Sequence, residues 1–157
     1  MKNLGTIACA VILGIVSMGT STVWAQAGAH VVVVPADLKW VDVPSLPAGA
    51  KLAVIEGPLN EAVPFTFRLK LPAEYKIPAH WHPAIEHVTV ISGVLYMGAG
   101  DKLDPKQTRP LPAGSVVIMP PKTNHFGWTK GETIVQIHGV GPWAVTYVNP
   151  ADDPRKK

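Results

Sequence analysis

The sequence predicts an all-β protein built as a small antiparallel β-barrel. Sixteen prolines and fourteen glycines divide the 157 residues into short apolar segments, which disfavours long helices. These segments are rich in β-branched residues, and several of them alternate apolar with polar side chains, as half-buried strands do. No stretch after the amino terminus keeps a helical period over a dozen residues. We expect about nine short strands, enough to close a barrel and remove exposed sheet edges.

The first 27 residues have the pattern of a cleaved export signal. Lys2 gives a short basic start, residues 4–18 form an apolar run, and Ala25-Gln26-Ala27 has the small-x-small form of a signal peptidase site. The run is shorter than the about 20 residues that a membrane span needs, so an uncleaved anchor is the less favoured alternative. We therefore expect a periplasmic or secreted protein that has no membrane segment after cleavage.

Composition narrows the function classes. The only cysteine, Cys9, lies within the expected signal, so the mature chain has no thiol or disulfide chemistry. The 14 basic and 11 acidic residues nearly balance and are dispersed, which makes no case for nucleic acid as a partner. The basic end at 155–157 is expected to be part of a flexible, solvated tail over residues 150–157.

The expected elements follow the signal in order. Residues 28–50 hold one or two amino-terminal strands and a linker that ends in a loop at 44–49, and residues 51–149 form the barrel. Ser92-Gly93 between two apolar runs predicts a hairpin, and residues 98–110 form a polar excursion. A strand-like pattern also begins at His125. The remaining expected strands are 31–34, 39–41, 51–56, 65–71, 88–91, 94–97, 116–119, 133–138 and 143–148.

One stretch carries potential metal ligands. His80, His82 and Glu86 fall on positions of the same parity, and an extended strand points every second side chain to one face, so the three would converge. Imidazole and carboxylate ligands suit first-row divalent metals, and two histidines with one carboxylate can hold iron with coordination positions left open. His87 has the opposite parity and should point away.

The same residues resemble the two motifs of the cupin family. The first motif, His-x-His, three residues, Glu, six residues, Gly, is matched by His80, His82, Glu86 and Gly93. The second motif, Gly, five residues, Pro, then a His five further on, is matched by Gly114, Pro120 and His125. The resemblance implies a single-domain double-stranded β-helix of the jelly-roll type.

The resemblance also implies that His80, His82, Glu86 and His125 hold one divalent transition metal, with iron or manganese favoured and zinc or nickel as alternatives. The sequence departs from the family pattern at three places outside this ligand set. The family usually has glycine where this chain has Glu74 and Lys122, and asparagine where it has Thr129. We expect these departures to affect turn geometry more than metal binding.

The expected ligand set suggests several functions. Three neutral imidazoles and one carboxylate around a divalent ion leave a net charge near +1, which favours anionic oxygen ligands. An octahedral ion would keep two adjacent positions for a bidentate substrate, or for a substrate and dioxygen. The favoured function is a metal-dependent, dioxygenase-like enzyme acting on a small oxygen-chelating molecule. A hydrolase or isomerase on the same site, a non-catalytic metal or small-ligand binding module, and a metal-free structural domain are the alternatives.

Several polar residues outside the ligand set are candidates for a second role. His138 and Gln136 share parity on a late strand, where they would either line the cavity as acid, base or hydrogen-bond partner or lie at the barrel rim. Tyr96 could donate a phenolic hydrogen bond in the pocket. Arg68 is expected on a polar strand face, with an anionic substrate as the alternative partner.

Aromatic residues close to the ligands have two interpretations. Trp81, Phe126 and Trp128 either pack the barrel and a subunit contact or shape an apolar pocket for a planar substrate. The apolar segment at 28–40 precedes the barrel and could add to a neighbour's sheet, which would give a homodimer, or fold back on its own barrel.

Overall fold

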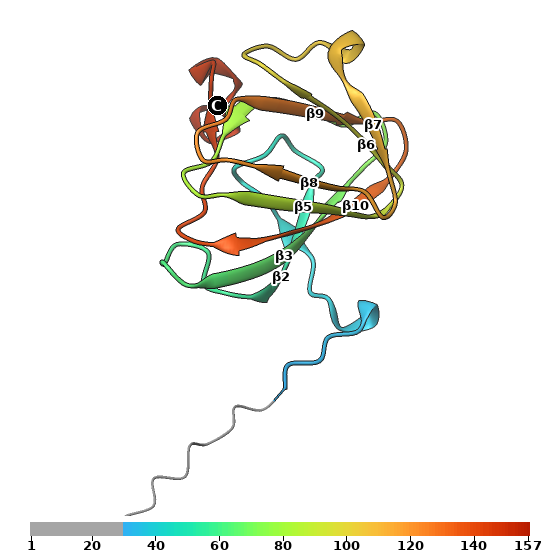
Figure 1. Ribbon diagram of the computed structural model, residues 1–157, viewed down its shortest axis with the longest axis vertical. Helices are drawn as coiled ribbons and strands as arrows, with labels where there is room; N and C mark the ends of the chain where they lie inside the picture. The colour runs from blue at the N-terminus through green and yellow to red at the C-terminus, as the bar shows by residue number, and fades with distance from the viewer. Residues whose placement is uncertain (1–29) are drawn as a thin grey trace, which may run out of the picture. The chain divides into compact units, whose positions relative to one another are not determined.

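Eleven strands in two antiparallel sheets make up the part of the chain that this computed structural model describes, residues 30–157 (Figure 1). The expected export signal lies outside the described residues. Val32–Lys157 form one compact unit, and His30 and Val31 before it are exposed. Within residues 30–157, no helix has the length and hydropathy to span a membrane.

The two sheets contain six and five strands. The first sheet has the spatial order β1 (Val41–Asp42), β2 (Lys51–Glu56), β3 (Pro64–Leu71), β10 (Thr133–Val140), β5 (Glu86–Ser92) and β8 (Val116–Met119). The second has the order β11 (Thr146–Tyr147), β4 (Lys76–Trp81), β9 (His125–Thr129), β6 (Val94–Ala99) and β7 (Arg109–Pro112). Four single-turn 3-10 helices complete the described elements: η1 (Pro35–Asp37), η2 (Pro105–Gln107), η3 (Pro150–Asp152) and η4 (Pro154–Lys156). The predicted all-β, antiparallel class is confirmed.

The core lies between the sheets and follows from the period-two pattern of the strands. On β3, Phe65, Phe67, Leu69 and Leu71 are buried while the residues between them are partly exposed. β10 repeats this alternation, and its inward side chains pack beside those of β3 because the two strands pair along their whole length. This side-by-side burial of apolar side chains on two central strands stabilises the first sheet against the second.

The expected hairpin around Ser92-Gly93 is wrong. β5 pairs with β10 and β8 in the first sheet, whereas β6 pairs with β9 and β7 in the second. Gly93, with φ of 77°, turns the chain from one sheet to the other. A Cβ at Gly93 would lie 2.5 Å from the carbonyl oxygen of Glu132, so this crossing requires glycine.

The amino-terminal segment differs from the expectation in two ways. The valine run at 31–34 forms no strand, and Val31 and Val32 are more than three quarters exposed. The loop at 44–49, in contrast, belongs to the core, because Leu46 is only 3% exposed. The linker expected over residues 28–50 therefore ends inside the packed domain.

Two tyrosines hold this loop in place. The Tyr147 hydroxyl donates to the carbonyl of Ser45 at 2.8 Å, and the Tyr75 hydroxyl donates to the carbonyl of Pro47. Burial raises the pKa of Tyr147 to about 12, so the hydroxyl remains a donor at any physiological pH. These contacts hold Leu46 in the core, where it lines the cavity between the sheets.

The last residues form ordered turns where the sequence predicts a frayed tail. Asp153 caps η4, and its carboxylate accepts a hydrogen bond from the Arg155 Nε at 2.7 Å. Arg155 also donates to the carbonyl of Val145 at 2.9 Å. The guanidinium thereby ties the end of the chain to the segment before β11, a long-range contact that composition does not reveal.

The three departures from the cupin motifs lie at two turn positions and at one buried strand position. Glu74 and Lys122 have φ of 55° and 60°, so both occupy the left-handed conformation that glycine adopts without strain. Thr129 is fully buried, and its hydroxyl donates to the carbonyl of Pro72 at 2.6 Å. The same hydroxyl accepts from the backbone N–H of Tyr75 at 3.3 Å, which closes the turn that contains Glu74. Both turns therefore form although Glu74 and Lys122 stand where the family usually has glycine.

Candidate metal centre

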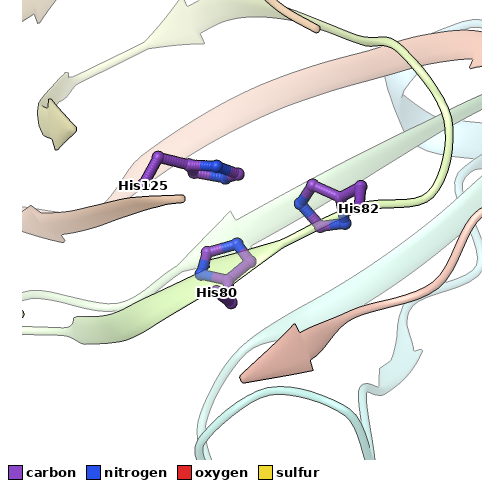
Figure 2. A group of neighbouring side chains, drawn as sticks. All are labelled: His80, His82 and His125. Atoms are coloured by element: carbon purple, nitrogen blue, oxygen red, sulfur yellow. The ribbon is translucent and has the colours of Figure 1, made fainter. Parts of the chain in front are cut away.

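Three histidine side chains converge between the sheets, as Figure 2 shows. His80 lies near the end of β4, His82 follows the end of that strand, and His125 begins β9. His80 and His125 are register partners on adjacent antiparallel strands, which places their side chains on the same face. One ligand atom from each of the three side chains lies within 4.8 Å of the others, and all three residues are buried.

Glu86 completes the cluster from the opposite sheet. It is the first residue of β5, and its Oε2 lies 3.1 Å from the Nε2 of His82 and 3.5 Å from the Nε2 of His125. The parity argument found these residues but not their arrangement. His82 and Glu86 do not follow one another along a single extended strand, because the chain bends at 83–84 and crosses between the sheets.

The backbone fixes which nitrogen of each ring faces the centre. The Nδ1 atoms of His80 and His82 each lie 2.7 Å from a carbonyl oxygen, those of Pro78 and Ala144. The Nδ1 of His125 lies 2.9 Å from the carbonyl oxygen of Thr123. A carbonyl oxygen only accepts, so each Nδ1 carries the proton and each Nε2 keeps a free lone pair. Metal-binding histidines are oriented by this kind of contact.

The charge state of the rings supports the same assignment. Burial lowers the pKa of His80 well below its usual value, and the neighbouring rings of His125 and His82 lower it further. Burial also lowers the pKa of His125, although the Glu86 carboxylate opposes this shift. Both rings are therefore neutral near pH 7, the form in which imidazole binds a metal.

Two atoms of the cluster have no hydrogen-bond partner. The Nε2 of His82 and the Oε2 of Glu86 are buried and unpaired, although they face each other. A nitrogen lone pair and a carboxylate oxygen repel at this distance unless a proton or a metal ion lies between them, and leaving both unsatisfied is costly. The three histidines present therefore fit a divalent metal ion, and the Glu86 carboxylate lies beside two of them.

The cluster borders a small, mostly apolar cavity of about 50 Å³. His80, Glu86 and His125 contribute its polar wall, and the remaining wall comes from core side chains such as Val135 and Leu46. A cavity of this size holds a few water molecules or the reacting end of a larger molecule. The site can thus bind oxygen atoms next to the histidines while excluding bulk water.

Sequence reasoning missed Trp143, which lines this cavity. Its indole lies parallel to the His82 ring, and it packs edge-on against Phe67 with 4.8 Å between ring centroids. The residue lies after the cis peptide bond between Gly141 and Pro142, far from both motifs. No spacing rule connects it to the histidines, so only the fold identifies it.

His138 and Gln136 do not reach the cavity. They alternate on β10 with Val135 and Ile137, which are buried, so they lie on the outer face of the first sheet. His138 is exposed and stacks on His87, with 4.8 Å between ring centroids and 14° between planes.

Arg68 also lies on this outer face, where it has a hydrogen-bond partner. Its Nε donates to the Oε1 of Gln136 at 3.1 Å, so it does not project into the barrel.

The other candidates also lie outside the cavity. Tyr96 stacks on Trp128 on the outer side of β6 and β9, with 4.1 Å between ring centroids, because the inward positions of β6 belong to Leu95 and Met97. Phe126 alternates with His125 and is fully buried on the far side of β9.

Trp81 alternates with His80 and is partly exposed. The aromatic residues next to the ligands in sequence therefore do not shape the pocket.

The sequence matches no protein-family profile and no curated protein. Its fold is similar to that of solved cupins. The polyketide cyclase RemF from Streptomyces resistomycificus superposes with a TM-score of 0.63 at 17% identity, over 82% of this chain and 92% of the other. A proposed acetylacetone dioxygenase from Methylibium petroleiphilum gives 0.59 at 16%, over 83% and 90%. An RmlC-like cupin from Shewanella frigidimarina gives 0.57 at 13%, over 71% and 91%. These likenesses confirm the predicted cupin-type antiparallel β-barrel fold.

Proposed function

We propose that this protein is a metal-dependent cupin enzyme whose single divalent ion is held by His80, His82, His125 and Glu86. The observation that carries the proposal is the set of three Nδ1 contacts to backbone carbonyls, at 2.7, 2.7 and 2.9 Å. Each contact directs an Nε2 lone pair away from the backbone, and the Glu86 carboxylate faces two of these nitrogens. Such a four-ligand set suits iron or manganese, with zinc or nickel as alternatives.

The reaction we favour is a dioxygenase-like oxidation of a small molecule that chelates through oxygen. When bound, the metal would supply Lewis-acid activation of the chelating oxygens and, if it is iron, redox chemistry. The residues of the protein would compensate charge, orient the histidine rings and exclude water. Glu86 offsets part of the ion's charge, the carbonyls of Pro78, Ala144 and Thr123 hold the rings, and the apolar wall excludes water. The similarity to a proposed acetylacetone dioxygenase supports this choice.

The first test is elemental analysis of the mature protein, purified without a metal-binding tag. We expect about one iron or manganese per chain in the wild type and almost none in His125→Ala. His138→Ala is the matched control, because His138 lies on the outer face and should leave metal content unchanged. Equal metal in wild type and His125→Ala would contradict the proposal.

Activity is then measured as oxygen uptake with β-diketones and other oxygen chelators. We expect turnover by the metal-loaded wild type that is lost in His125→Ala and kept in His138→Ala. A binding module is the second candidate, favoured by the small volume of the cavity. It would show ligand-dependent melting without oxygen uptake or product.

We propose further that the enzyme works after export, in the periplasm or outside the cell, because residues 1–27 have the pattern of a cleaved signal. The mass of the protein recovered from the periplasmic fraction tests this. Loss of residues 1–27 or 1–25 is expected, and a full-length chain in the cytoplasm would contradict it.

A further inference from the structure

A second, larger hollow adjoins the metal centre. The inner cavity of about 50 Å³ shares Met97 and His125 with a groove of about 280 Å³. Only the reacting end of a molecule fits in the inner cavity, whereas the groove approaches the volume of about 300 Å³ at which small-molecule sites begin. The body of a substrate that reaches the histidines therefore has room in this groove.

The residues that line the groove come from β6 and β7 of one sheet, β8 of the other and the segments beside them. Its walls are mainly apolar and include Met97, Leu111, Val117 and Met119. Arg109 is the one charged residue that lines it within the described part of the chain. A molecule bound there would meet an apolar surface that carries a single positive charge.

The strand register turns Arg109 toward the groove. Arg109 pairs with Met97 and Leu111 pairs with Leu95, and residues paired directly across two antiparallel strands point to the same face. Met97 and Leu95 line the inner cavity, so Arg109 stands on the inward-facing row of β7. Within residues 30–157, no carboxylate forms an ion pair with it.

The register also gives the distance between the charge and the metal centre. Ala99 pairs with His125, and Met97 lies two residues before Ala99 on β6. Two strand spacings and two residues along a strand separate the Cα atoms of Arg109 and His125 by about 12 Å. An extended arginine side chain covers roughly half of this distance, which leaves a gap that a chain of several carbon atoms can bridge.

We propose that the groove binds the body of an organic anion, with an apolar chain or ring along Met97, Leu111 and Met119 and its negatively charged group on Arg109. The other end of this anion carries the oxygen atoms that reach His80, Glu86 and His125. The inference deepens the proposed function and rests on it for the chelating end. Arginine binds carboxylate and phosphate groups through paired N–H donors, so either group satisfies the site.

A charge on an edge strand also has a simpler role, because it discourages pairing with other chains. To discourage such pairing, the Arg109 side chain needs only to be exposed to solvent. This role does not require that the residue stand on the inward row beside an apolar groove open to His125. The two roles make different predictions for ligand binding.

The test compares suberate with octanoate, a dicarboxylate and a monocarboxylate of equal chain length. Isothermal titration calorimetry of the metal-loaded wild type should show about tenfold tighter binding of suberate, because only suberate has a second carboxylate for the arginine. Arg109→Gln should remove this preference while octanoate affinity stays the same. Arg68→Gln is the matched control, since Arg68 lies on the outer face, and it should keep the preference.

The outcomes separate the two proposals. Equal affinity for both probes in the wild type, or a preference that survives in Arg109→Gln, would overturn the assignment of the groove while leaving the metal centre intact. Metal content is measured on the same samples. Absence of metal from the wild type would overturn the proposed function, and with it the chelating half of this inference.

Discussion

The imidazole of His82 lies parallel to the indole of Trp143, with 4.8 Å between ring centroids and 18° between planes. The contact covers one face of the His82 ring, while the Nδ1 contact to the carbonyl of Ala144 fixes its rotation. The Nε1 of Trp143 is buried and makes no hydrogen bond, so the indole contributes through its shape and its face. Trp143 therefore holds the His82 ring in place by packing and donates no hydrogen bond to it.

Trp143→Phe should keep most of this support. The phenyl ring retains a flat surface for His82 and removes a buried donor that has no partner, so we expect a change in unfolding free energy below about 1 kcal/mol. Trp143→Ala should cost about 2–4 kcal/mol, because it leaves a cavity beside Phe67. Urea denaturation of both variants measures the difference. Equal destabilisation by the two substitutions would contradict the role given to the aromatic face.

Glycine at the two left-handed turn positions should stabilise the protein. Glu74→Gly and Lys122→Gly each relieve a positive φ, and we expect a gain of about 0.5–1 kcal/mol per site after the larger chain entropy of glycine is subtracted. Thermal melting of the single variants gives the sign. Lys130→Gly is the matched control, because Lys130 is exposed and has no positive φ, and it should lose stability. A loss at Glu74 or Lys122 as large as at Lys130 would contradict the argument.

The sequence predicts the fold class because alternation depends on local spacing, and alternation along β3 predicts its buried face. The resemblance to the two cupin motifs, in contrast, is what predicts that His125 joins His80 and His82. Sheet assignment depends on long-range pairing, which is why β5 and β6 were expected as a hairpin. The expected positions of His138 and Tyr96 differ from the observed ones for the same reason, because parity along a strand does not indicate which of its two faces is buried. The contact of Trp143 with His82 can be identified only from the three-dimensional structure, because no sequence motif connects the two residues.

Acid should destabilise the metal-free protein. The pKa values of His80 and His125 are lowered in the folded chain, mainly by burial, whereas unfolded imidazoles titrate near 6.5. Below about pH 6.5 the unfolded chain therefore binds more protons than the folded chain, and the free energy of unfolding falls by about 1.4 kcal/mol per pH unit for each ring. Above this range both states are neutral and the rings contribute no slope.

Chelator-treated protein unfolded in urea between pH 7.5 and 5 measures this slope. His80→Gln should flatten it by removing one titrating ring. Stability that rises on acidification would contradict the assignment of neutral buried rings.

Metal removal should lower the melting temperature of the wild type. A ligand that binds only the folded chain stabilises it by about 4 kcal/mol at a concentration a thousand times its dissociation constant. Glu86→Gln keeps the size of the side chain but removes its charge, so the metal-dependent gain should shrink. His87→Gln is the neighbouring control, because this ring faces outward against His138. Equal gains in all three proteins would show that the ion binds elsewhere.

The placement of Glu86 opposite His125 has a consequence for the lifetime of the folded chain. The two sheets share no strand pairing in the part of the chain described, so their joint consists of packed side chains and connecting turns. The proposed ion, held by Glu86 on one sheet and by His125 on the other, would link the two sheets across the core. If this link forms only after the sheets have packed together, metal binding would lower the unfolding rate and leave the folding rate unchanged.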